Sequence, residues 1–231
     1  MSVLRRLLSP QNVVVIGGGV WGRSVIEQCQ KLGFEGQIFA VHPTAETLAG
    51  VPTYRSVSDL PNAPDAAFIG VNRIATIEQV RALSAKGAGG AVCFASGFLE
   101  TKEEDADGAA LQSALIEAAG VMPIIGPNCY GFVNYLDRLC LWPDQHGGRA
   151  VDTGVAIVTQ SSNIMINLSM QQRGLPIAYA LTAGNQAQTS LAALGRAVLD
   201  DPRVTALGLY IEGIGDLKDF ENLARHASAL N

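Results

Sequence analysis

Short apolar runs alternate with segments of helical periodicity along almost the whole chain, and this alternation constrains the fold more than any other feature. Residues 12–16 form a β-branched apolar run, and apolar residues then recur at helical spacing from 25 to 32. Similar apolar runs occur at 37–41, 66–71, 90–94 and 122–125. Strands joined by helices of about ten to fifteen residues form right-handed βαβ units, so this part of the chain predicts a parallel sheet.

The periodicity breaks over residues 135–152, and we predict a linker there. The alternation then restarts, with strands predicted at 155–159, 177–181 and 206–211 and helices at 164–172, 190–199 and 216–229. The sequence therefore predicts two consecutive α/β domains, at 1–134 and 153–231. A doubly wound domain usually has about five or six strands. We therefore expect the second domain, with three, to be incomplete at its C-terminus.

The charge and residue composition exclude several classes of protein. Sixteen Lys and Arg residues against 21 Asp and Glu give a net charge of −5, with no basic stripe, which argues against binding to nucleic acid or to an acidic membrane. The uncharged stretches at 153–172 and 174–195 are rich in Gln, Ser, Thr and Asn, so no transmembrane helix is expected. The four cysteines lack CxxC spacing. They predict buried free thiols in a reducing cytoplasm, with metal binding or disulfides as the alternatives.

A G-x-G-x-x-G turn at residues 17–22 lies directly after a predicted strand and before a predicted helix. In that context the glycines allow close approach of a pyrophosphate to the helix N-terminus, although a tight turn without a ligand is the alternative. An NAD site also needs an acidic residue at the end of the second strand, and an NADP site an arginine. That strand instead ends Val41-His42-Pro43-Thr44. The turn therefore favours another adenosine pyrophosphate, with CoA the foremost candidate.

Seven blocks of residues, in this order, resemble the NDP-forming acyl-CoA synthetases, which include ADP-forming acetate–CoA ligases and the α-subunit of succinyl-CoA synthetase. The blocks are the glycine turn, Val41-His42-Pro43, Ala95-Ser96-Gly97-Phe98, Gly126-Pro127-Asn128-Cys129-Tyr130-Gly131, Thr159-Gln160-Ser161-Ser162, Gly184-Asn185-Gln186-Ala187 and Tyr210-Ile211-Glu212-Gly213-Ile214. The resemblance covers essentially the whole chain. It implies a Rossmann-like CoA-binding domain at 1–134 and, after the linker, a flavodoxin-like domain similar to that of succinyl-CoA synthetase at 153–231.

The resemblance also implies positions for CoA, all at carboxyl ends of predicted strands, where open α/β sheets bind ligands. The phosphates would lie over the glycine turn, at Gly17, Gly19, Val20, Trp21 and Gly22. The rest of the cofactor would follow the later loops: adenosine near His42 and Pro43, the connecting arm along Val71 and Asn72, and the thiol near Ser96 and Asn128. Many relatives carry basic residues where Thr44 and Gln186 stand here, so the 3′-phosphate needs another cation, for which Arg23 and Arg73 are the candidates.

In the second domain, the resemblance implies a phosphate site at Ser161, Ser162 and Asn163, with Ser162 or Asn163 as the cap of a helix. Relatives have a glycine at position 162, and an ordinary serine-rich helix cap is the alternative. Glu212 would orient a phosphorylated histidine by accepting its ring N–H. A solvated loop glutamate is the alternative for Glu212.

The family interconverts acyl-CoA and a carboxylic acid through an acyl phosphate and a phosphohistidine. None of the three histidines, His42, His146 and His226, matches the catalytic position, so we expect the chain alone to be inactive. The resemblance predicts a cytoplasmic CoA-binding portion of an acid–thiol ligase, with CoA and a small carboxylic acid as ligands and homo-oligomerisation left open. ATP or ADP and Mg²⁺ would be bound by an ATP-grasp domain or subunit outside this chain, and no metal site is expected within it. The alternatives are a non-catalytic CoA- or acyl-CoA-binding regulator and an NAD(P)-dependent oxidoreductase.

Overall fold

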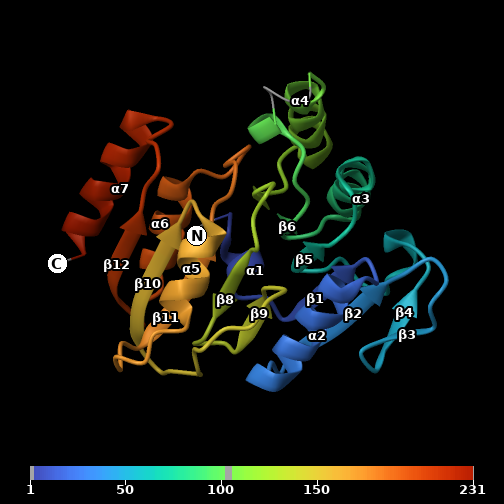
Figure 1. Ribbon diagram of the computed structural model, residues 1–231, viewed down its shortest axis with the longest axis horizontal. Helices are drawn as coiled ribbons and strands as arrows, with labels where there is room; N and C mark the ends of the chain where they lie inside the picture. The colour runs from blue at the N-terminus through green and yellow to red at the C-terminus, as the bar shows by residue number, and fades with distance from the viewer. Residues whose placement is uncertain (1–2, 102–105, 231) are drawn as a thin grey trace.

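The computed structural model describes residues 3–101 and 106–230 and contains two β-sheets flanked by helices (Figure 1). The first sheet has seven strands in the order β3-β4-β2-β1-β5-β6-β7, and every pair except β3 and β4 is parallel. Its strands are β1 (Asn12–Ile16), β2 (Gln37–Val41), β3 (Thr47–Leu48), β4 (Val51–Tyr54), β5 (Ala66–Ile69), β6 (Ala91–Cys93) and β7 (Ile124–Ile125). The chain winds outward from β1 in one direction through β2 and in the other through β5. The crevice at the carboxyl ends of β1 and β5 is therefore the expected ligand site of a doubly wound sheet.

Both faces of this sheet are buried, which explains the continuous apolar runs in the sequence. Alternate residues of β1 pack on opposite sides: Val13 and Val15 belong to the core under α2, and Val14 and Ile16 to the core under α3 and α4. The helices are α1 (Arg5–Leu8), α2 (Val20–Leu32), α3 (Arg73–Lys86) and α4 (Gly108–Ala119), with short 3₁₀ turns η1 (Val57–Asp59) and η2 (Leu99–Thr101).

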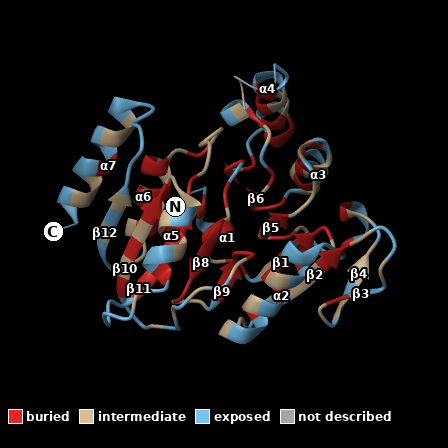
Figure 2. Ribbon diagram, viewed as in Figure 1, coloured by how far each residue is buried: buried red, intermediate tan, exposed pale blue. Residues whose placement is uncertain are grey.

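The second sheet has five strands in the order β12-β10-β11-β8-β9. They are β8 (Phe132–Asn134), β9 (Leu139–Leu141), β10 (Gly154–Thr159), β11 (Ile177–Thr182) and β12 (Val204–Tyr210). The parallel strands β10, β11 and β12 match the three predicted ones, and their helices are α5 (Ser162–Ser169), α6 (Leu191–Leu199) and α7 (Leu217–Ala229). Figure 2 shows that the strands near the middle of the molecule are buried, whereas α7 is largely exposed.

The structure differs from the sequence-based prediction at the predicted linker. Strand β9 lies within residues 135–152 and forms a hairpin with β8, which pairs antiparallel to β11. Each strand of the hairpin has only three residues, too short a run to show a periodicity in the sequence. The hairpin therefore belongs to the second sheet, although the division of the chain into domains at 134 and 153 stays a prediction. Among the described residues, no helix is both long and apolar enough to cross a membrane.

A polar cluster, which we call the α1 cluster, joins the N-terminal helix to the second sheet. The two hydrogens of the buried Asn134 amide are shared among three acceptors: the carbonyl of Leu8 (2.9 Å), the carboxylate of Asp137 (2.9 Å) and the hydroxyl of Tyr179 (3.2 Å). Arg203 pairs with Asp137 and with Asp201, each at 2.8 Å. The α1 cluster therefore fixes the start of the chain against β8, β11 and β12.

The α1 cluster is expected to make stability depend on acid pH. Burial would raise the pKa of Asp137 and of Asp201, but hydrogen bonds, chiefly from Arg203, outweigh it and hold both pKa values below the ordinary value. Ionised carboxylates therefore stabilise the fold above about pH 4, the usual aspartate pKa, and this contribution is lost as the pH falls through the lower folded-state values.

Thermal unfolding should show this contribution as a decrease in melting temperature from about pH 5 to about pH 2. Arg203→Met should be less stable than the wild type at neutral pH, and the difference should shrink toward the acid end. Arg225→Met serves as the control, because Arg225 forms only an exposed pair with Glu221. Parallel pH profiles for wild type and Arg203→Met would contradict this account.

Candidate functional site

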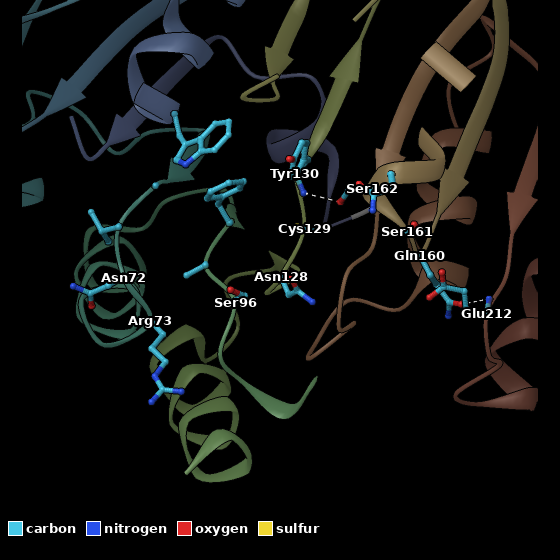
Figure 3. A pocket seen from close by; sticks show the side chains of 16 residues that line it. Asn72, Arg73, Ser96, Asn128, Cys129, Tyr130, Gln160, Ser161, Ser162 and Glu212 are labelled. Atoms are coloured by element: carbon cyan, nitrogen blue, oxygen red, sulfur yellow. Dashed lines mark hydrogen bonds between the residues drawn. The ribbon is translucent and has the colours of Figure 1, made fainter. Parts of the chain in front are cut away.

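The loops after β1, β5, β6 and β7 meet at the carboxyl edge of the first sheet and line a cleft of about 780 Å³, which we call the large cleft. Its opposite wall comes from the second sheet, at the start of α5 and just after β12 (Figure 3). The lining residues are Trp21, Gly70, Val71, Asn72, Arg73, Phe94, Ala95, Ser96, Asn128, Cys129, Tyr130, Gln160, Ser161, Ser162, Asn163 and Glu212. The fold thus places ends of strands from both sheets around one space.

The glycine turn is closely packed between Gly17 and Gly22 and open at Gly19. Gly17 has a φ of +104°, and a Cβ at Gly22 would lie 2.1 Å from the carbonyl oxygen of Gly17, so α2 can begin directly against the turn. Gly19 is the N-cap of α2, and nothing lies within 4 Å of a Cβ placed on it. The N-terminus of α2 and the space above Gly19 are therefore suited to an anion.

A second cavity, of about 660 Å³, lies on the other side of the turn, and we call it the α3 cavity. Its floor is apolar and includes Ile16, Val41, Val57 and the alanines of α3, whereas Arg55, Ser56, Ser58, Gln79 and Lys86 supply its polar groups. Among the described residues, no Asp or Glu lines it. Both cavities include Val71, and the turn segment contributes Gly17 to the α3 cavity and Trp21 to the large cleft. The two spaces therefore adjoin at Val71, which lies beside Gly17 of the glycine turn.

Three aromatic rings line the large cleft on the side of the first sheet. The centroid of Phe94 lies 5.4 Å from that of Trp21 and 5.6 Å from that of Tyr130, and Trp21 remains 42% exposed. Tilted ring pairs at such distances are favourable. The sequence analysis did not single out Phe94 or Tyr130, although both lie in or beside the blocks that carry the family resemblance.

The start of α5 forms the wall opposite these rings. The Ser161 hydroxyl accepts a hydrogen bond from the Ile164 amide (3.4 Å), so Ser161 is the N-cap, and the prediction of Ser162 or Asn163 as the cap is wrong. Ser162 is the first helical residue, and its hydroxyl accepts from the Tyr130 amide (3.1 Å) across the cleft (Figure 3). Ser162 therefore links the loop after β7 to the helix that the sequence predicts to bind phosphate.

Glu212 is exposed at the edge of the large cleft, and Gln160 holds its loop. The Gln160 side-chain oxygen accepts from the amides of Glu212 and Gly213, and its amide nitrogen donates to the Gly213 carbonyl (2.6 Å). Figure 3 shows the side chains of Gln160 and Glu212 close together. In the sequence, Gln160 is recognisable only as part of the block Thr159-Gln160-Ser161-Ser162. A polar residue directly after a buried strand was the available signal for this positioning role.

Asn128 lies in the loop after β7, which is hydrogen-bonded to the loop after β11. Asn128 has a φ of +56°, and its amide nitrogen donates to the side chain of Asn185 (3.4 Å). Asn185 donates in turn to the carboxylate of Glu100, which accepts from the Gly97 amide (2.6 Å). The loops after β6, β7 and β11 are therefore bonded together, a link through Glu100 and Asn185 that the sequence analysis missed.

The remaining predicted residues lie around the two cavities as follows. Gly19, Val20 and Gly22 belong to the glycine turn itself but line neither cavity. The His42 ring lies against Gly18, and its Nδ1 accepts from the Thr44 (3.2 Å) and Ala45 (2.8 Å) amides. Pro43 lines the α3 cavity, and Asn72 caps α3 through the Ala75 amide (3.0 Å). The ligand contacts assigned to these residues stay predictions.

Burial raises the pKa of all four cysteine thiols. All four are free and buried, as the sequence predicts. Cys129 lines the large cleft, but burial raises the pKa of its thiol to about 12, so the thiol is protonated near neutral pH and a poor nucleophile. In the described part of the chain, no cluster of three or more His, Cys, Asp or Glu side chains has the arrangement of a metal site.

Comparison with known proteins finds a match to one family in each part of the chain. Residues 11–135 match the family described as a CoA binding domain, and residues 152–230 match the succinyl-CoA ligase like flavodoxin domain. The chain is 31% identical to a trans-feruloyl-CoA synthase from an unknown prokaryotic organism, over 97% of this chain and 33% of that protein. It is 28% identical to the α-subunit of an ADP-forming acetate–CoA ligase from Pyrococcus furiosus, over 96% of this chain and 49% of that subunit.

A solved structure supports the same relationship. The apo form of the dinucleotide-forming acetyl-coenzyme A synthetase 1 of Ca. Korarchaeum cryptofilum superimposes with a TM-score of 0.86 at 27% identity, over 97% of this chain and 50% of that one. The chain thus spans about a third to a half of the length of these relatives. The CoA-binding domain match covers more than half of the chain, and almost the whole chain superimposes on this synthetase. The chain therefore belongs to the NDP-forming acyl-CoA synthetase family, as its Rossmann-like CoA-binding domain and flavodoxin-like second domain.

Proposed function

We propose that the chain binds CoA as part of an NDP-forming acid–CoA ligase. The observation that carries this proposal is that the large cleft and the α3 cavity adjoin at Val71, beside the glycine turn. CoA has the same three parts in line: an adenosine, a diphosphate and a long arm that ends in a thiol. The apolar floor of the α3 cavity suits the adenine, the N-terminus of α2 suits the diphosphate, and the large cleft suits the arm.

The thiol end of CoA would lie near Ser96 and Asn128, facing the second sheet. The start of α5, with Ser161, Ser162 and Asn163, lies on that side of the large cleft, and a helix N-terminus favours a phosphate group. This arrangement supports a reaction in which the acyl group passes between the CoA thiol and a phosphate held at α5. The names of the relatives support a carboxylic acid as the second substrate.

We further propose that Glu212 orients a phosphohistidine supplied from outside this chain. Its loop is fixed by Gln160, and its carboxylate is exposed at the edge of the cleft, where it could accept an imidazole N–H. Such a histidine would exchange phosphate with an ATP-grasp domain or subunit, which would also hold ATP or ADP and Mg²⁺. The residues of this chain bind and orient the other participants.

The α3 cavity offers little support for a nicotinamide dinucleotide. NAD binding uses a carboxylate at the end of the second strand to hold the ribose hydroxyls. Here that position is His42, whose Nδ1 is bonded to its own loop, and none of the residues described along the α3 cavity is acidic.

Calorimetric titration with CoA, NAD and NADP tests the proposal, with Gly19→Asp as the diagnostic variant. The backbone of Gly19 is compatible with any residue, and its Cβ would enter open space, so the fold should be retained. The new carboxylate would lie beside the diphosphate, and like charges about 4 Å apart repel by about 1–4 kcal/mol, or about fivefold to several hundredfold in affinity. We expect the wild type to bind CoA in preference to both nicotinamide nucleotides and Gly19→Asp to bind CoA at least about fivefold more weakly.

Val121→Asp is the matched control. It makes the same charge change at a side chain that is 99% exposed, just before β7 and therefore at the amino edge of the sheet, away from both cavities. Preferred binding of NAD or NADP, or equal CoA affinities for Gly19→Asp and Val121→Asp, would overturn the proposal.

A further inference from the structure

Two basic side chains belong to the α3 cavity without a carboxylate partner in the described part of the chain. Arg55 follows β4, and its Nη1 donates to the carbonyls of Pro43 (3.1 Å) and Ala45 (3.2 Å). Lys86 ends α3, and its Nζ donates to the carbonyl of Ser58 (2.9 Å). Carbonyl partners orient both groups but leave their positive charges uncompensated, so the α3 cavity is suited to an anion.

The guanidinium of Arg55 retains donors for such an anion. Its two carbonyl bonds both use Nη1, and within residues 3–101 and 106–230 no partner bonds to Nε or Nη2. Nε and Nη2 together form the planar edge that binds a phosphate in a bidentate manner. The bonds to residues 43 and 45 also hold Arg55 beside the end of β2, where a doubly wound sheet places the ribose of a bound nucleotide.

The neighbouring acidic group does not neutralise this site. The carboxylate of Asp59 accepts from the amide (2.9 Å) and the hydroxyl (2.7 Å) of Ser56, within the cap of η1, and Asp59 is not among the residues that line the α3 cavity. Ser56 and Ser58 do line it, and their hydroxyl oxygens lie 2.6 Å apart. The polar side of the cavity therefore combines two cations with two hydroxyls.

We propose that Arg55, assisted by Lys86, binds the 3′-phosphate on the ribose of CoA and makes the site selective for CoA over 3′-dephospho-CoA. This inference rests on the proposed CoA function. With the adenine on the apolar floor and the diphosphate over the glycine turn, the ribose lies between them, and Pro43 at the end of β2 lines the same space. A phosphate on the ribose then lies next to Arg55.

The structure places the two arginines considered from the sequence elsewhere. Arg73 lines the large cleft, and its Nη1 donates to the Gly97 carbonyl (2.8 Å). Arg23 lies on α2 beside Glu27, at 4.0 Å. Neither lines the α3 cavity.

The test is the affinity of four proteins for CoA and for 3′-dephospho-CoA: the wild type, Arg55→Met, Lys86→Met and Arg81→Met. Methionine keeps the aliphatic length and removes the charge. Charge-assisted hydrogen bonds contribute about 1.5–3 kcal/mol, so we expect Arg55→Met to weaken CoA binding about 10- to 150-fold. Its affinity for 3′-dephospho-CoA should change by less than about threefold, because that ligand lacks the group that Arg55 recognises. Lys86→Met should show the same pattern with a smaller loss. Arg81→Met is the control, since Arg81 is an exposed residue of α3 that does not line the cavity.

The outcomes separate this inference from the function on which it rests. Loss of CoA selectivity in Arg55→Met but not in Arg81→Met supports it. CoA binding with equal wild-type affinities for the two ligands, or an equal loss of both in Arg55→Met, overturns the role of Arg55 and leaves CoA binding intact. Failure of the wild type to bind either ligand overturns both proposals.

Discussion

Gly22→Val is expected to prevent stable folding of the first sheet with its helices. A Cβ at this buried position would lie 2.1 Å from the carbonyl oxygen of Gly17, and that oxygen belongs to backbone that cannot rotate away. Either α2 must move away from β1 or the turn must open, and both changes disrupt the core of Val13, Val15 and the buried face of α2. We expect a loss of more than about 3 kcal/mol in the free energy of unfolding, since overpacking against rigid atoms exceeds the usual range for cores.

Urea unfolding followed by far-ultraviolet circular dichroism measures this loss. Gly19→Ser is the control, because its side chain would enter open space and serine is a favourable N-cap. We expect the control to unfold within about 0.5 kcal/mol of the wild type. A Gly22→Val protein as stable as Gly19→Ser would mean that the close approach of α2 to the turn is not required.

Asn134→Leu is expected to have the second largest effect. Asn134 is fully buried: the two hydrogens of its Nδ2 are shared among acceptors on Leu8, Asp137 and Tyr179, and its Oδ1 accepts from the amides of Leu136 and Asp137. Leucine has a similar volume, so packing is preserved while these polar groups lose their partner. Because each buried polar group left unpaired costs about 1–3 kcal/mol, we expect a total loss of about 3 kcal/mol or more.

The same unfolding measurement applies, with Ser9→Ala as the comparison. Ser9 donates one hydrogen bond to Asp137 (2.5 Å) in the same α1 cluster, so its removal should cost about 1 kcal/mol. Similar losses in the two variants would show that the Asn134 contacts are replaced by water, and the account of a buried bridge between α1 and the hairpin would then be wrong.

The parallel strands could be predicted from sequence because burial on both faces leaves a run of apolar residues, as in β1 and β10. Strands β3 and β4 could not, since two residues at 47–48 and a strand containing Pro52 carry no readable alternation. The hairpin of β8 and β9 was missed for a related reason: its stability depends on pairing with β11, far along the chain.

The sequence could predict those residues of the candidate site that lie at the ends of strands. Parallel strands bring their carboxyl ends to one edge, so Val71, Ser96 and Asn128 were expected near the glycine turn. The cross-links Gln160 to Gly213, Asn185 to Glu100 and Ser162 to Tyr130 join residues 53, 85 and 32 positions apart. The pairing of β10 with β12 creates the first, and the relative placement of the two sheets creates the other two. Arg55 was missed because it follows β4, a strand that the sequence did not reveal.

Helix α2 starts at the glycine turn and packs at its other end against β9, where the Cys29 thiol donates to the Cys140 carbonyl (2.9 Å). One hydrophobic core therefore runs from β1 through α2 to the hairpin and on to β11. A hinge motion between the two sheets would have to break this core. We therefore expect the large cleft to be rigid, with a width that is the same before and after a ligand binds. A ligand that enters a preformed cleft loses little affinity to reorganisation of the protein, but a rigid cleft also limits the length of the ligand arm that fits inside it.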